Sequence, residues 1–310
     1  MGKIHTFLKT LKTNRKLLPK LVVDNLQRKQ MLNWMSDKAF LKLRYRTIFH
    51  KKLDLKDPKT FNEKLQWLKL YDRKPEYGIM VDKQAVKDFV AEKIGAEHLI
   101  PTIGVWDRPE DIDFNSLPNQ FVLKCNHDSG SVVICRDKAL FDQQKAVEKL
   151  RRKMDNSVFW FGREWPYSRV KPCVIAETYM EDETQKQGLT DYKFYCFNGE
   201  PKFLYVSVGL EDHSSATISF LNLDWTLAPF HRMDFKPLKS PPPKPKNYEK
   251  MIAYAKKLSC GFPFLRVDMY EIQGKLYFSE LTFTPSAGFT PFVPDEWDAT
   301  IGAWLELPNK

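Results

Sequence analysis

Two runs in which apolar residues predominate stand close together near the C-terminus, at residues 264–272 and 275–283. Their composition, and the Gln273-Gly274 pair between them, predict a β-hairpin. Each run carries one carboxylate, Asp268 or Glu280, where a strand would otherwise be apolar. Because strand side chains alternate between faces, the turn decides whether the two carboxylates meet. A two-residue turn puts them on opposite faces, whereas a three-residue turn with the glycine left-handed, or a bulge, puts them on one face.

The rest of the chain mixes helical and strand periodicity, which predicts an α+β fold. Helical spacing and capping signals predict helices at 60–71, 82–94, 138–154 and 247–258. Short apolar runs predict strands at 121–125, 132–135 and 174–180, a hairpin at 191–207 around Asn198-Gly199, and a strand pair within 216–227. Residues 1–57 are predicted to be helical and basic.

The formal net charge of +10 and the pI of about 9.2 favour an acidic partner. Much of the excess charge lies before residue 60. Such a segment is either a solvated helix face or, given its interspersed leucines, a helix that makes peripheral contact with an anionic membrane. No apolar run reaches the roughly 18 residues of a membrane span, and no secretory signal is recognisable. Five scattered cysteines fit a reducing compartment, so we expect a cytoplasmic protein, with any membrane contact at the inner face.

Candidate chemistry lies in a lysine-containing strand and in the hairpin. Lys124 precedes the polar loop 126–131, which either wraps a phosphate with its backbone N–H groups or is an ordinary hairpin loop. His127 in that loop either touches the phosphate or caps the turn. Asp268 and Glu280 either share a hard cation such as Mg²⁺ or form ion pairs with Arg266 or a nearby lysine.

In this order along the chain, the motifs resemble the ATP-grasp superfamily. They are most similar to its TupA-like branch, which is found with bacterial surface-polysaccharide genes. The segments that carry the resemblance are 124–130 (KCNHDSG), 191–200 (DYKFYCFNGE) and 280–285 (ELTFTP). The resemblance covers roughly residues 60–290 and implies two lobes whose antiparallel sheets grip ATP. The implied divisions are a basic helical extension at 1–57, the N-terminal part of the core at 58–120, a small nucleotide-binding lobe at 121–180 and a C-terminal lobe with the metal-binding hairpin at 181–310.

The resemblance also implies roles for individual residues in a site for ATP and Mg²⁺. The phosphates would be held by Lys83, Lys124, His127, Ser129, Gly130 and Ser131, and the adenine by Glu177, Thr178, Tyr179 and Met180. The catalytic candidates are Lys193, beside the γ-phosphate, and Arg266. The metal candidates are Asp268, Glu280 and Thr282. Two positions depart from the pattern: Thr282 replaces the usual asparagine ligand, and Asp128 stands where glycine is common.

Members of the superfamily phosphorylate a carboxylate, and an amine then attacks the acyl phosphate. By this resemblance, the chain would join an amino acid or amine to a uronic acid of an anionic surface polysaccharide or its precursor. The alternatives are a kinase acting on a sugar hydroxyl and a glycosyltransferase, the name often given to this branch. Recognisable nucleic-acid-binding motifs are absent from the sequence, so nucleic acid is not an expected partner. On this hypothesis, Glu280→Gln removes activity and relieves carboxylate repulsion, which would make the fold more stable.

Overall fold

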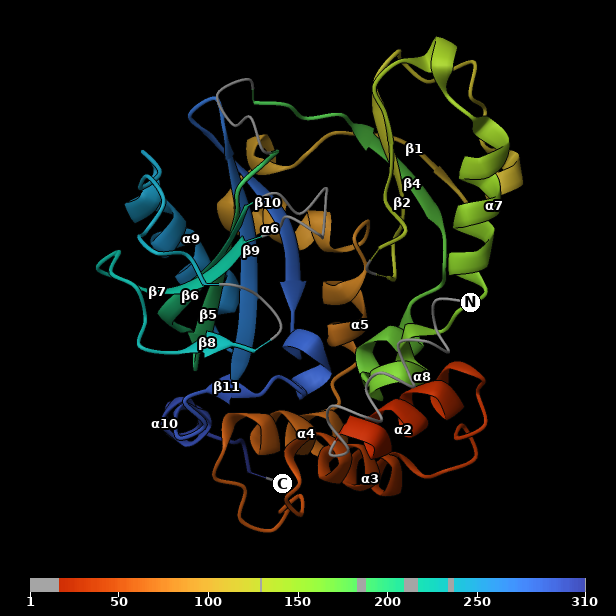
Figure 1. The fold of residues 1–310 in the computed structure, drawn as a ribbon. Helices are drawn as coiled ribbons and strands as arrows, with labels where there is room; N and C mark the ends of the chain where they lie inside the picture. Colours follow the sequence, from red (N-terminus) through yellow and green to blue (C-terminus); the bar gives the residue numbers. More distant parts are fainter. Residues whose placement is uncertain (1–16, 129, 183–187, 209–216, 234–236, 310) are drawn as a thin grey trace.

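The computed structural model describes residues 17–128, 130–182, 188–208, 217–233 and 237–309. Two antiparallel sheets lie side by side with helices around them (Figure 1). The smaller sheet has the strand order β1-β4-β2-β3 and the larger one the order β10-β9-β5-β6-β7. A short pair, β8 with β11, forms a third sheet. This arrangement confirms the α+β expectation.

The strands are short in the smaller sheet and longer in the larger one. The strands are β1 (Thr102–Trp106), β2 (Phe121–Cys125), β3 (Val133–Cys135), β4 (Val174–Thr178), β5 (Asp191–Phe197), β6 (Glu200–Val208), β7 (Thr217–Asn222), β8 (His231–Arg232), β9 (Phe264–Ile272), β10 (Lys275–Thr282) and β11 (Phe292–Val293). The α-helices of the described residues are α2 (Leu18–Arg28), α3 (Asp37–Phe49), α4 (Phe61–Tyr71), α5 (Glu76–Val81), α6 (Val86–Ile94), α7 (Gln143–Met154), α8 (Val158–Gly162), α9 (Tyr248–Ser259) and α10 (Trp297–Ala303).

Three apolar cores hold these layers together. One face of the larger sheet packs on α6 and α9, through residues such as Val90 and Met251. Its other face packs aromatic side chains of β5, β6 and β9 against α4, where Phe61 contacts Phe197 and Phe264. The smaller sheet packs on α7, whose Ala146 and Leu150 are its buried positions.

The described part of the N-terminal segment shares the aromatic core of the larger sheet. Phe40, Leu41 and Tyr45 of α3 are almost fully buried in the same cluster as Phe61 and Phe264. Helices α2, α3 and α4 lie together at one end of both sheets, at the bottom of Figure 1. Residues 18–55 are therefore packed into the body of the protein, and only residues 1–16 of the predicted extension lie outside the described residues.

Most predicted elements are confirmed, although several boundaries differ, among them the end of the strand expected at 174–180, which lies at Thr178. The helix expected at 82–94 begins at Val86, because the Asp82 carboxylate accepts the backbone N–H groups of Gln84 and Ala85 and makes a turn there. The helix expected at 138–154 begins at Gln143, where Asp142 caps it. The strand pair within 216–227 reduces to β7 and one bridge between Leu221 and Leu227.

The predicted domain boundaries at residues 58, 121 and 181 remain predictions. Strand β1 nevertheless pairs with β4, so the smaller sheet takes its first strand from residues 102–106. Among the described residues, no helix is both long enough and apolar enough to span a bilayer.

Candidate active site

The hairpin β9–β10 brings the two predicted carboxylates onto one face through a bulge. Its turn has only two residues, Gln273 and Gly274, both with positive φ (51° and 76°), as a type I′ turn requires. The register then shifts between Phe278 and Glu280, so that Glu280 stands directly opposite Asp268. A bulge adds one residue to one strand and reverses the parity that the turn alone would set. The expectation that the carboxylates share a face is confirmed.

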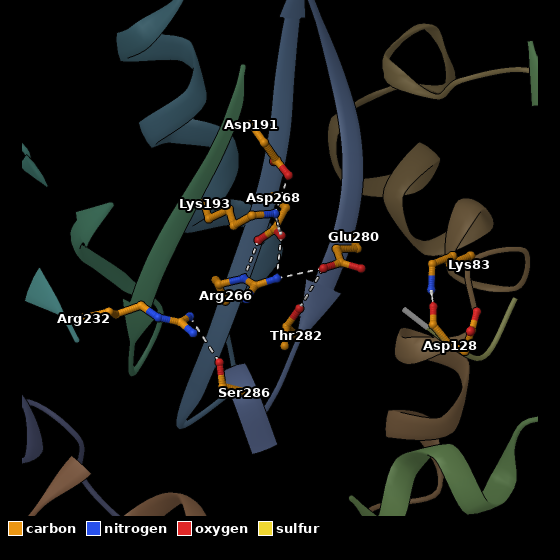
Figure 2. A network of polar contacts seen from close by, with 10 residues as sticks. All are labelled: Lys83, Asp128, Asp191, Lys193, Arg232, Arg266, Asp268, Glu280, Thr282 and Ser286. Atoms are coloured by element: carbon orange, nitrogen blue, oxygen red, sulfur yellow. Dashed lines mark hydrogen bonds and ion pairs between the residues drawn. The ribbon is translucent and has the colours of Figure 1, made fainter. Parts of the chain in front are cut away.

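Arg266 lies between these two carboxylates and binds both (Figure 2). Its Nε donates to Oδ1 of Asp268 at 2.7 Å, and its Nη2 donates to Oδ2 of Asp268 at 2.6 Å and to Oε1 of Glu280 at 2.7 Å. Lys193 of the neighbouring strand β5 donates to Oδ2 of Asp268 at 2.6 Å. It also donates to the Asp191 carboxylate. The ion-pair alternative therefore describes the hairpin in this structure.

Electrostatic coupling shifts the pKa values of these groups strongly. Burial acts to raise the pKa of Glu280, but Arg266, Lys193 and Lys83 outweigh it and hold that pKa at about 2. Burial likewise acts to lower the pKa of Lys193, and the Asp191 and Asp268 carboxylates raise it instead. Burial raises the pKa of Asp191. At neutral pH the site therefore holds Lys193 and Arg266 as fixed cations, with Glu280 ionised.

Within this cluster, Glu280 is better placed than Asp268 to bind a hard cation. Both oxygens of the fully buried Asp268 are occupied by Arg266 and Lys193. Glu280 is 31% exposed, and its Oε2 has no hydrogen bond or ion pair within the described chain. The Thr282 hydroxyl lies 3.4 Å from Glu280 Oε1. The described residues contain no group of three or more His, Cys, Asp or Glu side chains arranged for a metal. Glu280 and Thr282 thus offer oxygens that suit Mg²⁺ shared with phosphates, whereas Asp268 would first have to leave its cations.

The elements facing the hairpin supply a second set of cations. Lys83, in the turn before α6, donates to the backbone carbonyl of Asp128, and Figure 2 shows it across from Glu280. Lys124 of β2 forms an ion pair with Oε2 of Glu177 at 2.5 Å, and Lys87 of α6 binds Oε1 of the same carboxylate at 2.7 Å. Burial lowers the pKa of Lys83 and of Lys87.

Glu177 and Lys87 have contacts in this arrangement that the sequence did not predict. Glu177, expected beside adenine, uses both of its carboxylate oxygens to hold lysines. Lys87 was not predicted as a site residue. Its spacing of four residues from Lys83 was the available signal, but the pairing with a strand of the smaller sheet is a tertiary contact that spacing does not reveal.

The loop between β2 and β3 is held by its own side chains. The Ser131 hydroxyl accepts the backbone N–H of Cys125 at 2.8 Å and donates to Asp128 at 2.5 Å. Gly130 has φ +95°, and a Cβ there would meet only Lys153 Nζ at 3.5 Å, so its backbone angle and not space calls for glycine. Ser129 lies outside the described residues. Ser131 is therefore a structural residue of the loop in this structure.

Two buried side chains of the same loop carry polar atoms without a hydrogen bond among the described residues. His127 is 3% exposed, and neither ring nitrogen has a hydrogen-bond partner within the described residues. Burial lowers the pKa of His127. Asp128 Oδ2 likewise accepts no hydrogen bond, and the Lys153 ammonium lies 3.8 Å from it. Unpaired polar atoms at this depth are uncommon and favour a loop that rearranges around a ligand.

The predicted adenine-binding segment is partly engaged elsewhere. Thr178 ends β4, and its backbone N–H donates to Pro101 at 3.1 Å. The Tyr179 hydroxyl accepts Arg136 Nε at 3.2 Å, and the same guanidinium lies 5.5 Å from the tyrosine ring. Met180 is half-buried beyond the strand end. The structure places these residues at and just beyond the end of β4, an interior strand of the smaller sheet, and leaves their role with adenine a prediction.

A cavity of about 830 Å³ lies at the open end of the hairpin. Arg266, Glu280 and Thr282 form one wall, Asp128 and Lys153 a second, and the end of α2 a third. Lys124 and Glu177 do not line it, although Lys83 and Glu280 meet in a small adjoining pocket. The cavity therefore joins the metal candidates Glu280 and Thr282 to the N-terminal segment, and the phosphate candidate Lys83 lies in the adjoining pocket.

Two further lining features were not predicted, Glu164 and the turn at residues 286–288. Glu164 faces the cavity, accepts the Thr284 hydroxyl and has its pKa raised by burial. Beyond Thr284, residues 286–288 all have positive φ, and two of them, Ser286 and Ala287, are not glycine. Arg232 of β8 donates to the Ser286 hydroxyl at 3.2 Å.

Buried polar side chains of α4 hold this left-handed turn in place. Gln66 donates to the Gly288 carbonyl at 2.6 Å, and Lys69 donates to that of Ala287 at 2.8 Å. Burial lowers the pKa of Lys69 to about 7. Backbone strain of this kind persists where surrounding contacts enforce it, often at functional sites.

The chain is similar to one protein family and to several solved structures. A family model described as TupA-like ATPgrasp matches residues 63–306. A comparison with curated proteins gives no significant match.

Among solved structures, the chain is similar to a D-alanine–D-alanine ligase from Bacillus anthracis complexed with ATP. The identity is 18%, the TM-score is 0.38, and the match covers 66% of this chain and 55% of the ligase. It is also similar to the ATP-grasp ligase PsnB complexed with a phosphomimetic variant of its minimal precursor, Mg and ADP (11%, 0.41, 91% and 70%). A third match is a RimK domain ATP-grasp protein from Sphaerobacter thermophilus (12%, 0.40, 76% and 70%). The chain thus spans little more than half the length of the first of these proteins.

Proposed function

Because the chain belongs to the TupA-like ATP-grasp family, we propose that it binds ATP with Mg²⁺ and uses it to activate a carboxylate for attack by an amine. The observation that carries this proposal is the network of Lys193, Asp268, Arg266 and Glu280, which faces Lys83 and the glycine loop (Figure 2). It joins fixed cations to a carboxylate with a free oxygen at the wall of a large cavity.

In this proposal the triphosphate lies between the two sets of cations. Lys83 and Lys124 approach it from the smaller sheet's side, with the loop around Gly130 over it. Both lysines stand beside acceptors, the Asp128 carbonyl and Glu177, which orient them before any ligand binds. A lysine is suited to phosphate as a compact point charge.

The proposed metal ligands are Glu280 and Thr282, together with Asp268 after it exchanges its cations. Bound Mg²⁺ would supply charge neutralisation between the β- and γ-phosphate oxygens. Glu280 is ready for this role because its pKa of about 2 keeps it ionised at any working pH.

Arg266 and Lys193 are proposed to stabilise the charge that develops as the phosphoryl group leaves ATP. They are held in position before reaction by contacts that do not involve Asp268, Arg266 by Oε1 of Glu280 and Lys193 by Asp191, so these contacts remain when Asp268 exchanges its cations. Donors fixed in this way need little reorganisation, which is the main source of electrostatic catalysis. The strained turn at 286–288 and Glu164 would line the space for the acceptor.

For substrates, we propose an amino acid or amine and an anionic sugar, such as a uronic acid of a surface polysaccharide or its precursor. The net charge of +10 suits an anionic acceptor. A kinase acting on a sugar hydroxyl would use the same nucleotide site, and a glycosyltransferase would use the carboxylates with a nucleotide sugar.

A product assay separates these possibilities. The full chain is incubated with ATP, Mg²⁺, pooled amino acids, uronic acids and UDP-sugars, with hydroxylamine added in a parallel reaction to trap an acyl phosphate as a hydroxamate. ADP with an amide, and a hydroxamate in the trap, is the expected result. ADP with a phosphosugar would identify a kinase, and release of UDP without ATP consumption would identify a glycosyltransferase.

A further inference from the structure

We propose that the turn after α2 is a docking surface for an anionic lipid membrane, with Trp34 as its interfacial anchor. The Trp34 side chain is 82% exposed and that of Met31 is 55% exposed. A tryptophan held in water to this extent is unusual in a folded protein, because its large apolar ring gains more by burial than almost any other side chain. At a membrane surface, the ring and its N–H suit the headgroup region.

Exposed apolar side chains gather in this segment. Of the twelve exposed large hydrophobic residues in the described chain, four lie within residues 17–34, namely Leu17, Val22, Met31 and Trp34. Only two residues separate Met31 from Trp34, so the two lie close together on one turn. Isolated exposed apolar residues are ordinary, but a local excess around a tryptophan indicates an interaction surface.

The charge around this turn favours an anionic lipid surface over a neutral protein partner. Residues 17–53 contain nine lysines and arginines but only two acidic residues, Asp24 and Asp37. Asp24 is paired with Lys20 and Arg44, and Asp37 with Arg73 and Arg163. Both acids are therefore neutralised.

Three exposed cations close to Trp34 in the sequence are unpaired within the described residues. Arg28, Lys29 and Lys38 are exposed, and none has an ion pair within the described residues. We call Arg28, Lys29, Met31, Trp34 and Lys38 the Trp34 patch. An interfacial aromatic flanked by several basic residues combines apolar insertion with attraction to acidic headgroups.

The Trp34 patch adjoins the candidate active site. Arg28 and Gln30, on either side of Lys29, line the cavity that also contains Arg266 and Glu280. Docking through the patch would hold the α2 wall of this cavity against the lipid headgroups. A membrane contact made this way requires no spanning helix, which agrees with the absence of one from the described residues.

Co-sedimentation of the full chain with lipid vesicles tests this proposal. Vesicles of phosphatidylglycerol and phosphatidylcholine are compared with vesicles of phosphatidylcholine alone, at low and moderate salt. We expect binding to the anionic vesicles that falls as salt rises. Trp34→Ala should weaken this binding about tenfold, and Trp34→Phe should restore part of it.

Matched control variants separate the effect of the Trp34 patch from the effect of any exposed apolar or basic side chain. Leu140 is 85% exposed on another part of the chain, so Leu140→Ala should bind vesicles like the unchanged protein. Lys29→Glu with Lys38→Glu should abolish most binding, whereas Lys145→Glu with Lys149→Glu, of equal net charge, should not. Melting temperatures, measured in parallel, show that each variant is folded.

Several outcomes would overturn the proposal. These are equal binding to neutral and anionic vesicles, no binding to either, or equal effects of Trp34→Ala and Leu140→Ala. A dimer in sedimentation-velocity runs without lipid that Trp34→Ala dissociates would assign the patch to a second copy of the chain. ATP binding is measured separately by calorimetry, so a failure here leaves the proposed nucleotide site unaffected, and the converse also holds.

Discussion

At the scale of single residues, Arg266 determines the electrostatics of the hairpin because it binds both carboxylates. A hairpin carrying two facing carboxylates should suffer from their repulsion unless a cation separates them. Here the guanidinium separates them, with hydrogen bonds of 2.6–2.7 Å to both. The expectation that Glu280→Gln stabilises the protein is therefore wrong for this structure, because Glu280 is in a favourable ion pair.

Glu280→Gln should lower the free energy of unfolding at neutral pH by about 1–2 kcal/mol, after allowance for the partial exposure of the side chain. Burial opposes ionisation, but the cations Arg266, Lys193 and Lys83 lower the folded-state pKa from 4.5 to about 2. A lowered carboxyl pKa stabilises the fold above the unfolded value, and this contribution is lost as pH falls from about 4.5 towards 2.

Urea unfolding of the two proteins at several pH values measures this difference. It should be constant near neutrality and shrink below pH 4.5. The same substitution should remove ADP formation, because it replaces a carboxylate whose Oε2 has no partner among the described residues. A variant that is as stable as the parent at pH 7 would show that the ion pair contributes nothing.

At the scale of elements, the sequence predicted the hairpin but left open whether an odd-numbered turn or a bulge brings its carboxylates onto one face. Parity arguments depend on where an extra residue sits, and the extra residue proved to be in β10 and not in the turn. The residue types at positions 278–280 do not predict a bulge, because a bulge depends on how both faces of the sheet are packed. The start of α6 was missed for a similar reason: the Asp82 side chain competes with the helix for backbone N–H groups.

The loop between β2 and β3 provides a test at this scale. Gly130→Ala places a side chain at φ +95° and should cost about 1–2 kcal/mol of stability. If this backbone contacts phosphate, the substitution should also weaken ATP binding several-fold. Gly261→Ala is the control, since Gly261 has φ +88°, open space around it and a position beyond α9.

Equilibrium unfolding and calorimetry of both variants separate the two effects. Similar losses of stability with a loss of ATP affinity only in Gly130→Ala are expected. Equal ATP affinities in the two variants would make the loop an ordinary hairpin connection.

At the scale of the whole molecule, the sequence was least informative about the N-terminal segment. Its basic, amphipathic pattern predicted helices, which are present as α2 and α3. Pattern alone could not show that Phe40, Leu41 and Tyr45 enter the same core as Phe264, because that core forms only when segments far apart in the chain come together. The segment is thus both a wall of the cavity and part of the fold.

Phe40→Ala should therefore destabilise the whole protein and not a detachable arm. Phe40 is fully buried, and removal of such a ring costs about 3–5 kcal/mol. Urea unfolding followed by circular dichroism should show one transition at a lower midpoint. Leu140→Ala, at an exposed site, should leave the midpoint unchanged. A separate early transition that involves only part of the helical signal would contradict the shared core.

The cavity between the two sheets depends on single cations, on the hairpin and loop that hold them, and on the packing of α2 against α3 and α8. The central claim is that this junction binds ATP together with Mg²⁺. Isothermal titration calorimetry of the full chain with a non-hydrolysable ATP analogue, with and without Mg²⁺, tests it most directly. The account predicts one site whose affinity rises with Mg²⁺ and falls at least tenfold in Lys124→Met, while Lys171→Met, at an exposed pair with Asp107, binds normally. Folded protein that binds no nucleotide, or binds it equally well in both variants and without regard to Mg²⁺, would contradict the claim.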